Sequence, residues 1–214
     1  MEDRFTFDTY ITPETDVERQ IMSDAEWQRG VLWGAPRPGH PEGQVINHIR
    51  EVLANVEQLD VTATDRTRLR LIALLHDACK AFVRKGRHAT GAKHHGTLAR
   101  RMAERFLDDG AVLDIIELHD EAYACWRHLD RGRTHDAHQR ARELIGRVDY
   151  CFDLYLLFYR CDTMTGDKDR DSLAWFEAFC GRDAGGALGS VGRHDARLAK
   201  PRYATFDCPP RWSG

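Results

Sequence analysis

The strongest constraint on the fold is the segment at residues 69–80, which reads LRLIALLHDACK. Its aliphatic residues predict a helix that is apolar on most sides and therefore buried at the centre of the protein. The run ends in adjacent His76 and Asp77, and Lys80 follows three residues later. An imidazole and a carboxylate at the end of a buried helix supply half of a divalent-metal site. The segment therefore predicts both a central helix and part of a metal site.

The His-Asp dipeptide is informative only in its context. The sequence contains four such pairs: His76-Asp77, His119-Asp120, His135-Asp136 and His194-Asp195. The last two lie in polar stretches rich in Arg and Gly, which are typical of solvated loops. Only His76-Asp77 ends a strongly apolar segment, so we take this pair as the functional one.

Composition limits the class of protein. With 214 residues and 24.6 kDa, the chain suits one domain with a sizeable core and appended segments. A net charge of -3 gives no global indication of nucleic-acid binding. The acidic N-terminus lacks the apolar region of a signal peptide, and no segment approaches the roughly 20 apolar residues that span a bilayer. Six cysteines without a CxxC pair predict reduced thiols. We therefore expect a cytoplasmic protein that does not enter membranes.

Hydrophobic periodicity predicts an all-α bundle, with no strand pattern that lasts. The expected helices cover residues 15–29, 45–56, 69–79, 97–107, 112–119, 140–162 and 172–180. The expected organisation is a helical N-terminal extension (1–32), a single helical domain (33–180) and a loosely structured tail containing Gly and Pro (181–214). The aromatic residues of 140–160 fit either a central buried helix or a homodimer contact.

Several of the expected helices carry a residue that can bind a metal ion. The candidates are His48, His76, Asp77, His94 or His95, His119 and Asp162. Taken alone, each is more often an ordinary core or surface residue. Several converging polar residues, however, favour a hydrogen-bonded network or a metal site, because unpaired buried polar groups are costly. Mixed His and carboxylate donors suit Mn, Ni, Co, Fe or Zn, with Mg also allowed, and either one ion or two.

The order His, His-Asp, Asp resembles the HD-domain metal-dependent phosphohydrolase superfamily. HPEGQVINH at 40–48 is similar to the segment that opens the HD module of bacterial CCA-adding tRNA nucleotidyltransferases. LIALLHDACK, HHGTLARRM and LLFYRCDTMTG resemble later blocks of that module, so the likeness covers roughly residues 33–168. Gln44, Ala78 and Cys79 depart from the usual pattern. No transferase domain is recognisable upstream of residue 33, so the resemblance implies only the hydrolase module, an HD-domain helical bundle.

The resemblance implies roles for individual residues. The implied metal ligands are His48, His76, Asp77 and Asp162, which His95 (or His94) and His119 join in members with a wider site. Asp77 and Lys80 are the expected catalytic residues, with Lys80 near the phosphate. The expected substrate-binding residues are Lys80, Arg84, His40, His94 and Lys93.

Local charge fits a phosphorylated substrate. Residues 80–105 contain eight Lys or Arg but one acid, Glu104, which indicates either a rim that attracts anions or a solvated connector. A second basic cluster, Arg127–Arg133, lies beside Tyr123 and Trp126, which can stack on a base.

These features together predict a metal-dependent phosphodiesterase or phosphatase. The expected substrates are phosphorylated small molecules, nucleotides or RNA ends, with 2′,3′-cyclic or 2′/3′ phosphates as the specific expectation, hydrolysed by attack of metal-bound hydroxide. Two alternatives stay open: an HD-type di-iron oxygenase and a non-catalytic nucleotide-binding module.

Overall fold

The structure is a computed structural model that describes residues 7–38, 40–83, 91–168 and 170–187. Within these ranges it contains helices and no strand, apart from one isolated bridge between Arg37 and His40. This confirms the all-α prediction. The described helices include none that is both long and apolar enough to cross a membrane.

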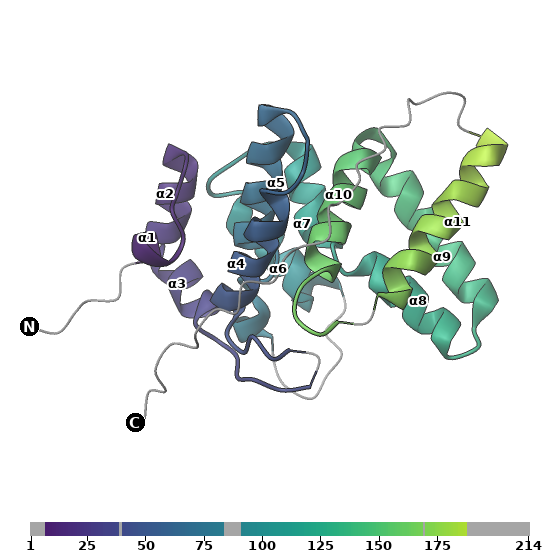
Figure 1. The fold of residues 1–214 in the computed structure, drawn as a ribbon, viewed down its shortest axis with the longest axis horizontal. Helices are drawn as coiled ribbons and strands as arrows, with labels where there is room; N and C mark the ends of the chain where they lie inside the picture. Colours follow the sequence, from purple (N-terminus) through teal and green to yellow (C-terminus); the bar gives the residue numbers. More distant parts are fainter. Residues whose placement is uncertain (1–6, 39, 84–90, 169, 188–214) are drawn as a thin grey trace, which may run out of the picture.

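Two antiparallel neighbours, α4 (Val45–Val56) and α5 (Ala63–Leu75), lie in the middle of the bundle (Figure 1). The predicted apolar face of α4 is buried, and His48 lies on it. Thr62 caps α5 by accepting a hydrogen bond from the backbone N–H of Asp65 at 3.1 Å. The last residues of α5 are fully buried, as the aliphatic run predicted. The helix ends at Leu75, so His76 and Asp77 leave it at its C-terminal end.

Three more helices surround this pair. The third and fourth predicted helices are α6 (His95–Ala103) and α7 (Gly110–Leu118), which pack against each other and against α5. Asp109 caps α7 by accepting hydrogen bonds from two backbone N–H groups. The last of the three surrounding helices is α10 (Phe152–Thr163), which packs against both α4 and α5. Five helices therefore converge on the end of α5 that carries His76.

The prediction of one long helix over residues 140–162 was wrong. The chain instead forms α9 (Thr134–Val148), a short 3-10 turn at Asp149–Cys151, and then α10. Residues 147–152, at the break itself, include no Pro or Gly. The break follows from tertiary packing, because α9 lies on α8 (Glu121–Asp130) while α10 turns inward. Tyr155 fixes the inward turn: its hydroxyl donates to the Leu118 carbonyl at 3.2 Å. The sequence also did not predict α8.

The last described helix, α11 (Asp171–Ala187), includes the predicted helix at 172–180 and runs seven residues beyond it. It packs on α8, and Figure 1 shows it beside α8 and α9 at one end of the molecule. Residues 188–214, most of the expected tail, lie outside the described residues. Among the aromatic residues that raised a dimer contact, Tyr155, Phe158 and Tyr159 are buried in the core, whereas Tyr150 is 64% exposed. A homodimer stays a prediction.

The N-terminal helices α1 (Phe7–Tyr10), α2 (Asp16–Ser23) and α3 (Ala25–Val31) pack against the other side of the bundle (Figure 1). The predicted helix at 15–29 is divided at Asp24, whose carboxylate caps α3. Trp27 is fully buried, and its indole N–H donates to the Leu74 carbonyl at 2.7 Å. This bond ties α3 to the last turn of α5, immediately before His76.

Gly30 lets α3 approach the backbone that follows Asp77. A Cβ atom at position 30 would lie 1.9 Å from the Ala78 carbonyl oxygen. We expect Gly30→Ala to lower the free energy of unfolding by about 1–3 kcal/mol, because the two backbones must separate. Urea unfolding followed by circular dichroism measures this change.

Gly146→Ala is the matched control. Gly146 is an exposed residue of α9, and an added Cβ would contact nothing within 4 Å. Alanine should stabilise the helix here by about 0.5–1 kcal/mol. Equal effects of the two substitutions would contradict the close approach at Gly30.

Candidate metal centre

Five helix ends or faces deliver the predicted ligands to one place. His48 comes from α4, His76 and Asp77 from the end of α5, His95 from the first residue of α6, His119 from the end of α7, and Asp162 from α10. All six are close together, and five of them are almost completely buried. The structure therefore brings together every residue that the sequence nominated as a metal ligand.

A first set of donors consists of His48, His76, Asp77 and Asp162. The Nε2 atom of His48 lies 2.9 Å from Asp162 Oδ1 and 3.2 Å from His76 Nε2. Asp77 Oδ2 is 3.5 Å from His76 Nε2 and 3.7 Å from His48 Nε2. Four side chains from three helices thus point their donor atoms at one small volume.

A second set shares Asp77 and adds His95, His119 and Asp120. The Nε2 atoms of His95 and His119 are 3.2 Å apart. Asp77 Oδ1 lies 3.3 Å from His119 Nε2 and 3.6 Å from His95 Nε2, while Asp120 Oδ2 lies 3.1 Å from His95 Nε2. Asp77 therefore directs one carboxylate oxygen at each set.

Backbone carbonyls orient two of the imidazoles. His76 Nδ1 lies 3.0 Å from the Ala73 carbonyl oxygen, and His119 Nδ1 lies 2.9 Å from that of Ile116. Because a carbonyl only accepts hydrogen bonds, Nδ1 carries the proton in both residues. Their Nε2 atoms face the centre, as expected of histidines that bind metal ions.

The centre is rich in negative charge. Burial raises the pKa of Asp77, but the Lys80 ammonium and His76 outweigh this effect and hold the pKa well below its usual range. Burial also raises the pKa of Asp162, and Lys168 and His48 outweigh it in the same way. Both carboxylates are therefore anionic at neutral pH.

The two central imidazoles differ in protonation. Burial lowers the pKa of His76 to about 3, so its Nε2 carries a lone pair. Burial lowers the pKa of His119 too, but Asp120 and Asp77 outweigh it and raise the pKa to about 9. Protonated His119 thus offsets the negative charge of Asp77 and Asp120 in the second set. A bound cation would offset the same charge.

The donor atoms fit a metal ion on two grounds. Ligands about 2.1 Å from one ion lie roughly 3.0–3.4 Å apart in octahedral or tetrahedral geometry. The closest donor pairs in the two sets lie within about this range, at 2.9–3.3 Å. In addition, Asp77 Oδ1 is buried and accepts no hydrogen bond from the described residues. Such an oxygen normally has a partner, and a cation would provide one.

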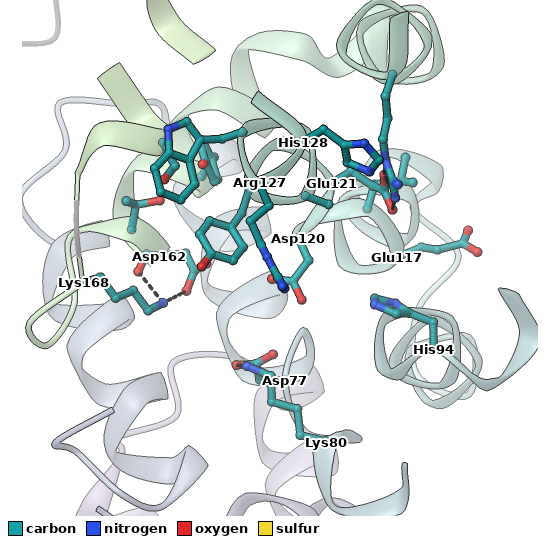
Figure 2. Close-up of a pocket in the computed structure, with 18 of the residues that line it drawn as sticks. Asp77, Lys80, His94, Glu117, Asp120, Glu121, Arg127, His128, Asp162 and Lys168 are labelled. Carbon is teal, nitrogen blue, oxygen red and sulfur yellow. Dashed lines mark hydrogen bonds and ion pairs between the residues drawn. The ribbon is translucent and has the colours of Figure 1, made fainter. Parts of the chain in front are cut away.

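Two lysines contact the same carboxylate oxygens that face the first donor set. Lys80 Nζ lies 2.5 Å from Asp77 Oδ2, and Lys168 Nζ lies 3.1 Å from Asp162 Oδ1 (Figure 2). Burial would lower the pKa of Lys80, but Asp77 and Asp120 raise it above its ordinary value. Lys80 is therefore cationic beside the centre.

The centre opens into a cavity of about 1060 Å³. Asp77, Lys80, Asp120, Asp162 and Lys168 are among the residues that line it, and Figure 2 labels them. Its lining also includes residues of α8 and, from α9, Arg140 and Arg147. Asp77, Asp120 and Asp162, which belong to the donor sets, therefore face the cavity.

The remaining predicted substrate-binding residues have different positions. His40 lines the cavity, and its Nδ1 lies 2.9 Å from Glu42 Oε1. His94 also lines the cavity, but its Nδ1 accepts the Gly96 N–H and caps α6. Lys93 is exposed and is not among the residues that line the cavity. Arg84 lies outside the described residues.

Two residues of the centre were missed in the sequence. Asp120 belongs to the His119-Asp120 pair, which was set aside, although this pair follows the apolar helix α7 as His76-Asp77 follows α5. That repeated pattern could have identified it. Lys168 follows Asp162 by six residues in a turn, and nothing in its spacing marked it.

Comparison with known families matches the central part of the chain. Residues 45–142 match the family model described as HD domain. The match includes His48, His76, Asp77, His95 and His119 but ends before Asp162. Among curated proteins and solved structures, none matches the chain, so a particular closeness to the CCA-adding enzymes is not supported. HD domains are commonly metal-dependent hydrolases, and the His and Asp groups here can hold a metal ion. Residues 45–142 of the helical bundle around this centre are thus similar to the HD domain.

Proposed function

We propose that this protein is a metal-dependent phosphohydrolase that acts on nucleotides or RNA ends. One observation carries the proposal: Asp77 directs its two oxygens at two donor sets, on the floor of an open cavity. The resulting centre, with Lys80 and Lys168 beside it, would bind phosphate oxygens together with one or two divalent ions. Mn, Ni, Co, Fe and Zn suit the mixed donors, and Mg is also allowed.

The residues of the centre have separate tasks in this proposal. When bound, a divalent ion supplies Lewis acidity and lowers the pKa of its water toward neutrality. Asp77 would help to hold the ion, and Asp77 and Asp120 would accept hydrogen bonds from the attacking water. Lys80 and Lys168 are point charges that hold the non-bridging phosphate oxygens as negative charge builds up.

The cavity favours a nucleotide over a simple phosphate ester. Tyr123 and Trp126, which line the wall, stack with ring centroids 5.7 Å apart, and Tyr123 is 44% exposed. An exposed aromatic face above a phosphate site can stack on a base. We propose 2′,3′-cyclic or 2′/3′ phosphates as the specific substrates.

Metal removal tests the proposal. Elemental mass spectrometry should find one or two ions per chain in the isolated protein. Turnover of bis-p-nitrophenyl phosphate and 2′,3′-cyclic AMP should disappear after treatment with EDTA, because the donor sets no longer hold an ion. Mn, Co or Ni added back should restore turnover. Turnover that survives complete chelation would contradict the proposal.

The second set of donors also supports a different candidate, an HD-type di-iron oxygenase. Here His95 and His119 would hold a second iron that Asp77 shares with the first. Two irons per chain with an electron paramagnetic resonance signal, and no hydrolysis with any metal, would favour this function. A protein that takes up no metal under any loading condition would instead be a non-catalytic binding module.

A further inference from the structure

The cavity is larger than a single nucleotide requires. Its volume of about 1060 Å³ lies at the upper limit of the roughly 300–1,000 Å³ that small-molecule sites occupy. Besides the residues at the metal centre, the lining of the cavity includes many residues of α8. The side chains on this part of the lining indicate what the additional space holds.

One face of α8 connects the centre to this space. Asp120, Ala124, Arg127 and Arg131 line the cavity and recur at spacings of three and four residues, so they form one stripe along the helix. Asp120 is at the metal end and Arg131 ends the helix. Figure 2 shows Arg127 extending from α8 toward Asp120. The stripe therefore begins at the metal centre and continues outward with two cations.

The two arginines of the stripe keep their charge available. In the cavity wall, Arg140 pairs with Glu121 at 2.7 Å and Arg147 lies 3.8 Å from Glu117. Neither Arg127 nor Arg131 lies within ion-pair distance of a carboxylate among the described residues. An arginine without a carboxylate partner, in a cavity beside a phosphate site, suits a further phosphate group.

The spacing along α8 fits successive groups of a nucleic-acid strand. Four residues of helix separate Arg127 from Arg131, a rise of about 6 Å. Tyr123 lies on the flank of the same stripe, and the Arg127 guanidinium lies 5.9 Å from the centre of its ring. The wall thus alternates aromatic and cationic groups, the combination that single-stranded nucleic-acid sites use.

We propose that α8 binds the strand behind the terminal phosphate, so that the preferred substrate is an oligonucleotide end and not a mononucleotide. Arg127 and Arg131 bind the phosphates that follow the terminal one, and Tyr123 with Trp126 stacks on an adjacent base. The inference rests on the proposed hydrolysis at the metal centre and names the substrate class for that site.

Binding and turnover together test this assignment. The first measurement is fluorescence anisotropy of 5′-fluorescein-labelled hexaadenylate with a 3′-hydroxyl, which cannot be hydrolysed at a terminal phosphate. Arg127→Gln/Arg131→Gln should weaken binding about tenfold or more and reduce the slope of log affinity against log salt by about two. The second measurement compares hexaadenylate ending in a 2′,3′-cyclic phosphate with 2′,3′-cyclic AMP as substrates. The double variant should raise KM for the hexanucleotide at least tenfold more than for the mononucleotide.

Arg142→Gln is the control. Arg142 is exposed on α9 and does not line the cavity, so its loss should leave hexanucleotide binding within about twofold of the wild type. The assignment to α8 would be overturned if the double variant raised KM equally for the hexanucleotide and the mononucleotide. It would also be overturned if Arg142→Gln weakened hexanucleotide binding as much as the double variant does.

The two proposals fail separately. Hexanucleotide binding that depends on Arg127 and Arg131, in a protein that hydrolyses nothing, would sustain the α8 assignment and end the hydrolase proposal. Hydrolysis of 2′,3′-cyclic AMP with no preference for the hexanucleotide would support the hydrolase proposal and end the α8 assignment.

Discussion

Asp77→Ala is expected to abolish metal binding and to lower phosphodiester turnover by about 1,000-fold or more. The reason is geometric: Asp77 is the residue that both donor sets share, with one oxygen 3.5 Å from His76 Nε2 and the other 3.3 Å from His119 Nε2. His48→Ala and His119→Ala each remove a donor from only one set. If both sets bind, each of these variants should therefore keep about one ion per chain. Elemental mass spectrometry and turnover of bis-p-nitrophenyl phosphate measure both effects.

Asp60→Ala is the matched control, because Asp60 is an exposed carboxylate in the loop before α5. It should keep the metal content and the turnover of the wild type. Circular dichroism must show that Asp77→Ala is folded, since Lys80 would lose its partner. A folded Asp77→Ala protein that retains its ions would show that Asp77 is not the shared ligand.

Arg70→Ala is expected to lower the free energy of unfolding by about 3–5 kcal/mol. Arg70 on α5 binds Glu18 on α2 through two nitrogens, at 2.8 and 3.2 Å, and Glu18 is fully buried. Arg70 also donates to the Thr12 carbonyl at 3.1 Å. Alanine would leave a buried carboxylate without its cation. Urea unfolding of the metal-free protein measures the loss without a contribution from bound ions.

The exposed pair Arg19–Asp16 provides the comparison. Arg19→Ala removes an ion pair whose side chains are 52% and 87% exposed, and should cost about 0–1 kcal/mol. Combining Arg70→Met with Glu18→Leu should recover part of the loss, because no unpaired charge then remains buried. A change below about 1 kcal/mol for Arg70→Ala would contradict the importance of this pair.

The sequence predicted the inner helices well and the outer ones poorly. The helix at 45–56 matches α4 because its apolar residues recur on one face that packs against α5 and α10. The break at Asp149–Cys151 left no sequence signal, since it depends on where Tyr155 finds its partner on α7. Helix α8 was missed because its inner residues are few: only Ala122 and Cys125 are buried.

The interior position of some donors could be predicted where local sequence determines it. His76 and Asp77 directly follow a helix whose last residues are apolar, and both side chains are buried. Lys168 could not be predicted, because its contact with Asp162 depends on the path of the turn after α10. The sequence also could not distinguish the positions of His94 and His95. His95 Nε2 lies 3.6 Å from Asp77 Oδ1, whereas His94 Nδ1 accepts the Gly96 N–H.

The contact between α3 and the end of α5 determines which truncated fragments of the chain can keep the centre intact. The recognisable family segment begins at residue 45 and ends at residue 142. A fragment cut at those limits would lack Asp162 on one side, and on the other the indole of Trp27 that holds the Leu74 carbonyl. The segment that matches the family model is thus shorter than the segment that contains all the donor residues and the Trp27 contact. Deletion studies that take their borders from family recognition alone would remove parts of the centre and of its support, and would record an inactive fragment.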